Sequence, residues 1–194
     1  MTITPPPNPR ADSPPLMQIL ESARTAIEEH GPDALTGRIA LRARVARSAY
    51  RELRAEIRAC LDLPGTPLDV IRALTAAQVR WADSNPNLYR FLVSRGYQRR
   101  SQQRTVERSD LAAEITAAAA RYFPRLADDP DAVEATLLGL IGVFDASLLR
   151  WLSQPVGTRE QLIDRLTAQA WLILDHHLRE FGIHCDPAVA PAGR

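Results

Sequence analysis

IALRARVARSAYRELRAEI, residues 39–57, is the stretch on which the fold of this chain most depends. No glycine or proline occurs between residues 38 and 63. Apolar and small side chains recur there at spacings of three and four residues, which is the period of one helix face. These residues are Ala46, Ala49, Leu53, Ile57 and Cys60. Periodicity alone therefore allows a single long helix that ends before Pro64-Gly65.

The same stretch is markedly basic, although the whole chain is not. The formal net charge of the chain is +1, and the sequence contains no lysine. Arginine suits phosphate groups and guanine edges because its planar guanidinium donates two parallel hydrogen bonds. A local nucleic-acid contact and a solvated helix surface both remain open interpretations. The arginines concerned are Arg38, Arg42, Arg44, Arg47, Arg51, Arg54 and Arg58.

Composition indicates a helical globular protein and no enzyme. The 194 residues are 45% apolar and 6% aromatic, which suits a helical core. Cys60 and Cys185 lie far apart, and the adjacent His176 and His177 would point in different directions on a helix. The sequence contains no GxSxG, HExxH or glycine-rich phosphate loop. We therefore expect no catalytic residue, no metal site and no cofactor.

The two ends of the chain are expected to have little fixed structure. Residues 1–14 are proline-rich and lack the apolar stretch of a secretory signal, and the tail at 184–194 carries Pro187 and Pro191. The most apolar window, from Leu137 to Phe144, falls well short of the roughly 20 residues that span a bilayer. These features predict a cytoplasmic protein without a membrane segment.

Helical periodicity extends along the rest of the chain, and no alternating strand pattern lasts more than a few residues. Thr66-Pro67 has the form of a helix start, a capping residue followed by proline in the first turn. The fold class predicted is therefore all-α. The expected helices cover residues 15–30, 67–84, 87–97, 105–123, 131–152 and 159–181, in addition to the basic stretch.

Three segments in this order resemble the tetracycline-repressor (TetR) family. ILESARTAIEEHGPDALT, residues 19–36, is similar to the family's first helix, which ends at a glycine before a threonine leads into the second. PLDVIRALTAAQVRWADSNPNLYRFL, residues 67–92, is similar to the helix before an asparagine-proline break and the tyrosine-containing segment after it. The last two helices resemble the pair through which the family dimerises as a four-helix bundle. The resemblance covers residues 16–182.

The resemblance implies a ligand-responsive transcriptional regulator, expected to be a repressor, that binds double-stranded operator DNA. It implies a DNA-binding region at residues 15–53 and a ligand-binding and dimerisation domain at 54–183. The helix-turn-helix would be atypical, because the distance from Ile39 to Tyr50 is one residue shorter than the family pattern. One residue turns a helix by about 100°.

Two registers compete for the basic stretch. In the first, which we favour, residues 39–43 form the second helix, Arg44-Val45 the turn and residues 46–49 the recognition segment, with Tyr50 beside it. In the second, residues 38–63 form one helix and no recognition helix exists, as the lack of a turn glycine indicates. The DNA contacts expected in the first register are Thr36, Arg38, Arg42, Arg44, Arg47, Ser48 and Tyr50.

The resemblance also implies a pocket between the middle helices for an apolar or amphiphilic effector. For any one residue of the candidate lining, a place in the core is the simpler alternative. Asp145 lies in an apolar run, and we expect it to find a partner such as Arg150 or Arg121 rather than to serve the pocket. The candidate lining is Trp81, Tyr89, Phe91, Phe144, Asp145, Leu148 and Trp151.

Apolar stripes on the last two helices predict a homodimer. The interface is expected at Leu140, Leu148, Trp171 and Leu174, whereas a closed monomer would satisfy every stripe internally. An alternative function is a dimeric small-molecule-binding or partner-binding helical protein that has lost sequence-specific DNA binding. A turn near Arg44 would favour the regulator, and an unbroken helix would favour this alternative.

Overall fold

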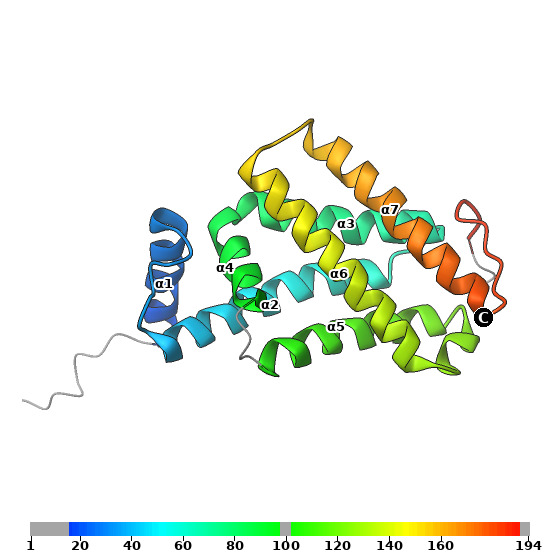
Figure 1. Cartoon of the computed structure of the whole chain (residues 1–194), viewed down its shortest axis with the longest axis horizontal. Coiled ribbons are helices and arrows are strands. Elements are labelled where there is room, and N and C mark those ends of the chain that lie inside the picture. Colours follow the sequence, from blue (N-terminus) through cyan, green and yellow to red (C-terminus); the bar gives the residue numbers. More distant parts are fainter. Residues whose placement is uncertain (1–15, 98–101, 191–194) are drawn as a thin grey trace, which may run out of the picture.

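A computed structural model describes residues 16–97 and 102–190, and within them the regular structure is entirely helical, as predicted (Figure 1). The predicted leader at residues 1–14 lies outside the described residues. The helices are α1 (Leu16–His30), α2 (Ile39–Leu61), α3 (Pro67–Ser84), α4 (Pro86–Tyr97), α5 (Gln102–Ala120), the short 3₁₀ helix η1 (Pro124–Ala127), α6 (Pro130–Ser153) and α7 (Arg159–Glu180).

The basic stretch forms one unbroken helix, and the turn that we expected at Arg44-Val45 does not exist. Every described residue with a positive φ is a glycine, and α2 contains no glycine that could reverse the chain. Val45 is fully buried, so a turn there would interrupt the row of buried apolar side chains with which the helix packs against its neighbours. The favoured register is therefore wrong, and the single-helix alternative describes this segment.

Local sequence signals explain where several helices begin. Thr66 accepts a hydrogen bond from the Asp69 amide at 3.2 Å, and the Asp69 carboxylate accepts one from the Thr66 amide at 2.9 Å. This reciprocal capping box, with proline at the next position, starts α3 at the predicted place. Thr158 and Gln161 make the same arrangement at the start of α7.

The helices assemble around α2, which packs against α1, α3, α4 and α5. α3 also packs against α7, and α5 against α6, so α6 and α7 complete the body on the far side of α3 and α5 (Figure 1). α1 stands at one end of the molecule, where it contacts α4 and the start of α2. α2 crosses residue 53, the boundary that we expected between two domains, without interruption.

Glu28 of α1 fixes the start of α4. Its carboxylate accepts hydrogen bonds from the backbone amides of Leu88 at 2.8 Å and Asn87 at 3.3 Å. The Asn87 side chain donates in return to the Glu28 carbonyl at 2.7 Å. A carboxylate at a helix N-terminus satisfies amides that have no partner inside the helix, so this contact joins α1 to the body.

The segment after α7 is held against the body, contrary to the flexible tail predicted for residues 184–194. The Leu68 amide donates a hydrogen bond of 3.2 Å to the Pro187 carbonyl, and Ile183 and Cys185 pack against the core. The prolines suggested a loose segment, but proline keeps a carbonyl that can accept such a bond. Residues 191–194 lie outside the described part of the chain.

Candidate functional site

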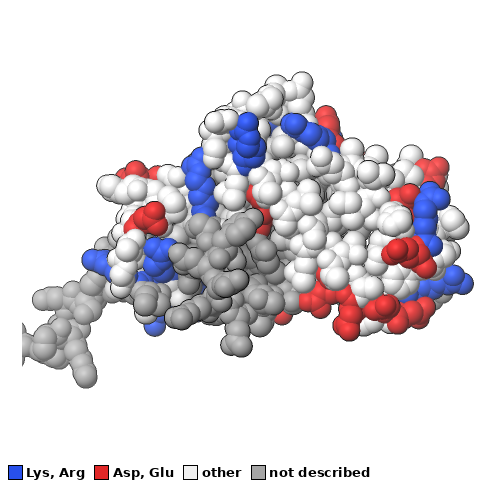
Figure 2. Space-filling view, viewed as in Figure 1, with Lys and Arg blue, Asp and Glu red and all other residues white. Residues whose placement is uncertain are grey.

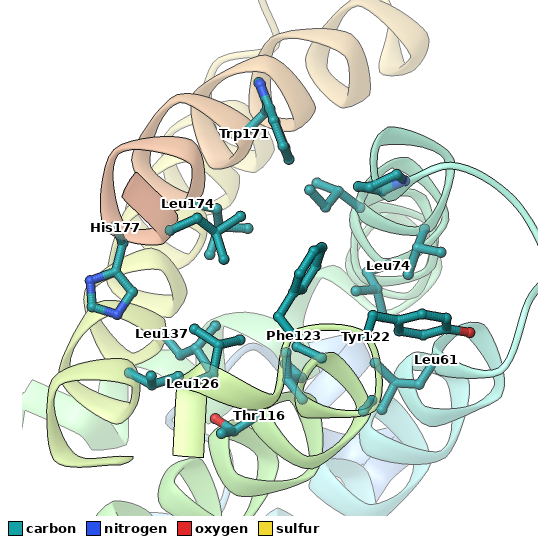
Figure 3. Close-up of a pocket in the computed structure, with 18 of the residues that line it drawn as sticks. Leu61, Leu74, Thr116, Tyr122, Phe123, Leu126, Leu137, Trp171, Leu174 and His177 are labelled. Atoms are coloured by element: carbon teal, nitrogen blue, oxygen red, sulfur yellow. The ribbon is translucent and has the colours of Figure 1, made fainter. Parts of the chain in front are cut away.

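An apolar pocket of about 180 Å³ lies where five helices converge. Its walls come from the end of α2, the first half of α3, the second half of α5, the first turns of α6 and the second half of α7, with η1 below (Figure 3). Side chains that contribute to these walls include Leu61, Leu74, Ile115, Phe123, Leu137 and Leu174. Because nearly all of the wall is hydrocarbon, the pocket suits the apolar part of a small molecule.

The pocket opens to solvent beside Leu63 and Tyr122. These two lining residues are 45% and 48% exposed, although both are large and apolar. Figure 3 shows the Phe123 ring in the space between α3 and α7, while the neighbouring Tyr122 ring turns towards Leu61. A small molecule can therefore reach the interior without unfolding of a helix.

A second hollow, of about 320 Å³, lies between α1 and the start of α2. Gln18, Ser22 and Arg38 contribute to its lining together with apolar side chains. This hollow is larger, but polar groups interrupt its wall. The pocket beside α7 is the better site for an apolar ligand.

His177 supplies the buried imidazole of the apolar pocket. Its side chain is 9% exposed, and its Nδ1 lies 3.2 Å from Glu180 Oε2 and 3.3 Å from Thr136 Oγ1. The ring also packs edge-on against Phe181, with 5.0 Å between the ring centres. Nε2 is buried and has no hydrogen-bond partner among the described residues.

The predicted ligand-binding residues lie elsewhere, and none of them lines this pocket. Trp81, Phe91, Phe144 and Leu148 are buried in the core, and Trp151 is half-buried against it. Of this set, Tyr89 and Asp145 line a separate cavity of about 50 Å³. The core alternative therefore describes most of the set.

Asp145 has a buried partner, but not one of the arginines that we expected. It accepts a hydrogen bond of 2.8 Å from the Tyr89 hydroxyl, which itself accepts one of 3.1 Å from the Gln78 amide. Arg150 instead donates to the Gln154 carbonyl, and Arg121 binds Asp62 at 2.9 Å. A partner satisfies Asp145, as predicted, but the partner comes from α4.

The predicted DNA-contacting residues do not share one surface. Arg42 packs over the Phe91 ring, 5.1 Å from its centre, and Tyr50 packs against the core. Thr36 donates to the Asp33 carbonyl before α2 begins. Ser48 is half-buried, whereas Arg38 and Arg44 are exposed.

A subset of the arginines does form one face. At 100° per residue, Arg44, Arg47, Arg51 and Arg58 fall within about 60° of one another on α2. Figure 2 shows several arginines at the end of the molecule that carries α1 and the start of α2. This arginine face is straight, because the helix that carries it has no turn.

Arg54 connects α2 to α5, a wall of the pocket. Its guanidinium binds both oxygens of Glu114, at 2.9 and 3.1 Å, and lies 3.4 Å from Asp110. The hydrogen bond from Arg54 lowers the pKa of Glu114 below its ordinary value, and the same bond raises the pKa of Arg54. Ionised Glu114 therefore stabilises the position of α5.

The surface of α6 that faces away from the body carries no charge along about three turns. Ala135, Gly139, Gly142, Val143 and Ala146 are exposed there, and Figure 2 shows a broad area without charged side chains across α6. In the described part of the chain α6 is also the one helix long and apolar enough to cross a membrane. Core helices pass the same test, and the opposite face of α6 is buried in the body.

The predicted dimer-interface residues point inwards instead. Leu140 and Leu148 are buried in the chain itself, and Trp171 and Leu174 line the apolar pocket. Apolar residues occur on every side of α6, so the sequence did not show which face is buried and which is exposed. The large apolar side chains exposed on these helices are Val143 and Leu172, which is 71% exposed.

No family model, no curated protein and no solved structure matches this chain. The resemblance to the TetR family therefore rests on the sequence segments alone. The described residues also contain no group of three or more histidine, cysteine or acidic side chains that could hold a metal ion.

Replacing Glu114 with glutamine is expected to lower the free energy of unfolding by about 1 kcal/mol at pH 7, because the ion pair with Arg54 is lost. A depressed carboxyl pKa contributes stability above the ordinary glutamate pKa, and that contribution disappears as the pH falls through the folded-state pKa. Urea unfolding of both proteins at pH 7 and at pH 3 measures this difference.

Glu56→Gln, on the exposed face of α2, is the matched control and is expected to change stability by less than about 0.5 kcal/mol. An equal loss for Glu114→Gln at both pH values would contradict the electrostatic origin of the contact.

Proposed function

We propose that this protein is a homodimeric helical receptor that binds an apolar small molecule in the pocket between α3, α5, α6 and α7. The pocket is the observation that carries the proposal, because it combines an apolar wall, an opening at Leu63 and Tyr122, and one buried imidazole. We propose that the protein binds its ligand in the cytoplasm and does not convert it. The lack of a catalytic motif in the sequence accords with binding alone. The effector would bind without a metal ion or cofactor.

The energetics support a ligand site over a packing fault. Protein interiors are close-packed and contain few voids larger than a water molecule. An enclosed cavity of about 180 Å³ costs about 4 kcal/mol at the value measured for truncated cores, and an opening reduces that cost. An occupant that restores the lost packing contacts would recover part of that cost.

The exposed face of α6 supports a second copy of the chain as the partner. Charged residues are depleted at the centre of stable interfaces, and this face carries none from Ala135 to Ala146. Around a twofold axis each copy offers the same surface to the other, so one charge-free face meets another. Gly139 and Gly142 present no side chain and allow the two helices to approach closely.

A DNA-binding regulator of the TetR type is the second candidate function. The arginine face of α2 favours it, because aligned guanidinium groups bind phosphates. With no turn in α2, this face supports contact with the DNA backbone, whose strength depends on salt and not on sequence. Release of an operator by a ligand would need a recognition element that reads bases.

Filling the pocket is expected to abolish ligand binding. Ala119→Phe places a ring in the pocket, whereas Ala117→Phe places the same ring on the exposed side of α5. With propylbenzene as the probe, Ala119→Phe should weaken binding at least about tenfold, and Ala117→Phe less than about twofold. Isothermal calorimetry measures both. Equal affinities in the two variants would place the probe outside this pocket.

Introducing a charge on α6 is expected to separate the dimer. Val143→Asp would bury a carboxylate without a partner at the centre of the proposed interface, so it should weaken self-association at least about 100-fold. Ala117→Asp, on the exposed side of α5, is the control and should leave self-association unchanged. Sedimentation velocity over a range of concentrations measures the dissociation constant. A wild-type chain that stays monomeric throughout would exclude the dimer.

DNA binding is expected to be weak, salt-sensitive and independent of sequence. Fluorescence anisotropy with the DNA upstream of the gene and with an unrelated fragment should give equal affinities, and Arg44→Gln with Arg51→Gln should reduce the salt slope by about 2. Arg165→Gln, on α7, is the control for loss of one exposed charge. Tight binding to the upstream DNA alone would instead establish the regulator.

A further inference from the structure

The opening of the apolar pocket is bordered by two short segments, one at the end of α2 and one after α5. Leu63 belongs to the first segment and Tyr122 to the second, and both line the pocket although they are exposed. Figure 3 shows the Tyr122 ring directed towards Leu61, the last residue of α2. A molecule that enters beside Leu63 and Tyr122 therefore passes between the end of α2 and the turn at residues 121–123.

An ion pair joins these two segments. Arg121 Nη2 donates a hydrogen bond of 2.9 Å to Asp62 Oδ1. Asp62 lies between the lining residues Leu61 and Leu63, and Arg121 directly precedes Tyr122. The pair therefore holds the end of α2 against the turn that follows α5, at the place where the pocket opens.

Each segment is also bonded to its own helix. The Leu63 amide donates to the Cys60 carbonyl at 3.3 Å, and the amides of Tyr122 and Phe123 donate to the Ala119 carbonyl at 3.0 and 2.9 Å. The segments therefore move with the ends of α2 and α5, and the width of the opening depends on the separation of those ends. The ion pair between Arg121 and Asp62 opposes an increase in that separation.

We propose that the Arg121–Asp62 ion pair is a latch that limits how fast a ligand enters and leaves the apolar pocket. This inference rests on the proposed function, because it takes the pocket as the ligand site. The two side chains are 54% and 75% exposed, so water competes for both and the pair breaks readily. Neither residue lines the pocket, so the latch acts on the rates of binding and leaves the affinity nearly unchanged.

The test measures both rate constants with the full chain and 1-fluoro-4-propylbenzene as the probe, by fluorine-19 exchange spectroscopy. Arg121→Gln and Asp62→Asn should each raise the association and dissociation rates about threefold and change Kd by less than about twofold. Combining the two substitutions should give the same rates as either one alone, because both remove the same ion pair. Both positions are exposed, so the substitutions leave the fold intact.

Salt provides a second measurement of the same latch. Screening weakens an exposed ion pair, so the wild-type rates should approach those of Arg121→Gln as NaCl rises from about 0.05 M to about 1 M. The rates of Arg121→Gln itself should change much less, because this variant has no ion pair to screen at the opening.

Arg159→Gln is the matched control. Arg159 of α7 pairs with Asp83 of α3 at 3.3 Å, and this pair is also exposed and joins two helices. Neither residue lines the pocket or adjoins a lining residue. Loss of this pair should leave both rates of the probe unchanged.

The outcomes distinguish the latch from the proposed function. A wild-type chain that does not bind the probe would overturn both. Binding with wild-type rates in Arg121→Gln and Asp62→Asn would keep the receptor and overturn the latch. Faster exchange in one of these variants alone would also overturn the latch, because the effect would then come from a single charge and not from the pair.

Discussion

The continuous apolar stripe of α2 is the constraint on which the rest of the structure depends. Val45, Ala49, Leu53 and Ile57 are all buried along one side of a single helix, and α1, α3, α4 and α5 pack against it. The opposite side of the helix carries arginines that remain in water or pair with acidic residues of α5. Because one helix organises four neighbours, the arginine face and the pocket wall at Leu61 belong to one rigid element.

Local chemistry predicted most helices but not the outcome in the basic stretch. The capping residue at Thr66 with its proline marked the start of α3, and the breaks at Gly31 and Asn85-Pro86 lie where they were expected. For residues 39–57 the lack of glycine indicated a single helix. The resemblance to the TetR family indicated a turn, and that resemblance decided the prediction. The structure follows the local signal, since no residue in this stretch readily adopts a left-handed turn.

The pocket could not be predicted in the same way. A leucine at Leu74 or Leu137 has the same spacing whether its stripe faces a filled core or a cavity, because the difference depends on volumes contributed by other helices. The aromatic residues predicted to line the ligand site are large, and they fill the core instead. His177 was the available signal, because it is a polar residue in an apolar run.

The length of α2 has a mechanical consequence. Its 23 residues span about 34 Å from Ile39 to Leu61, which forms part of the pocket wall. A rod of that length, tilted by about 5° at one end, moves its far end by about 3 Å. In a helix-turn-helix the turn would separate two helices, and a tilt of one helix would not be passed in full to the other. Because the helix is unbroken, a tilt at Leu61 would displace Arg44 as well.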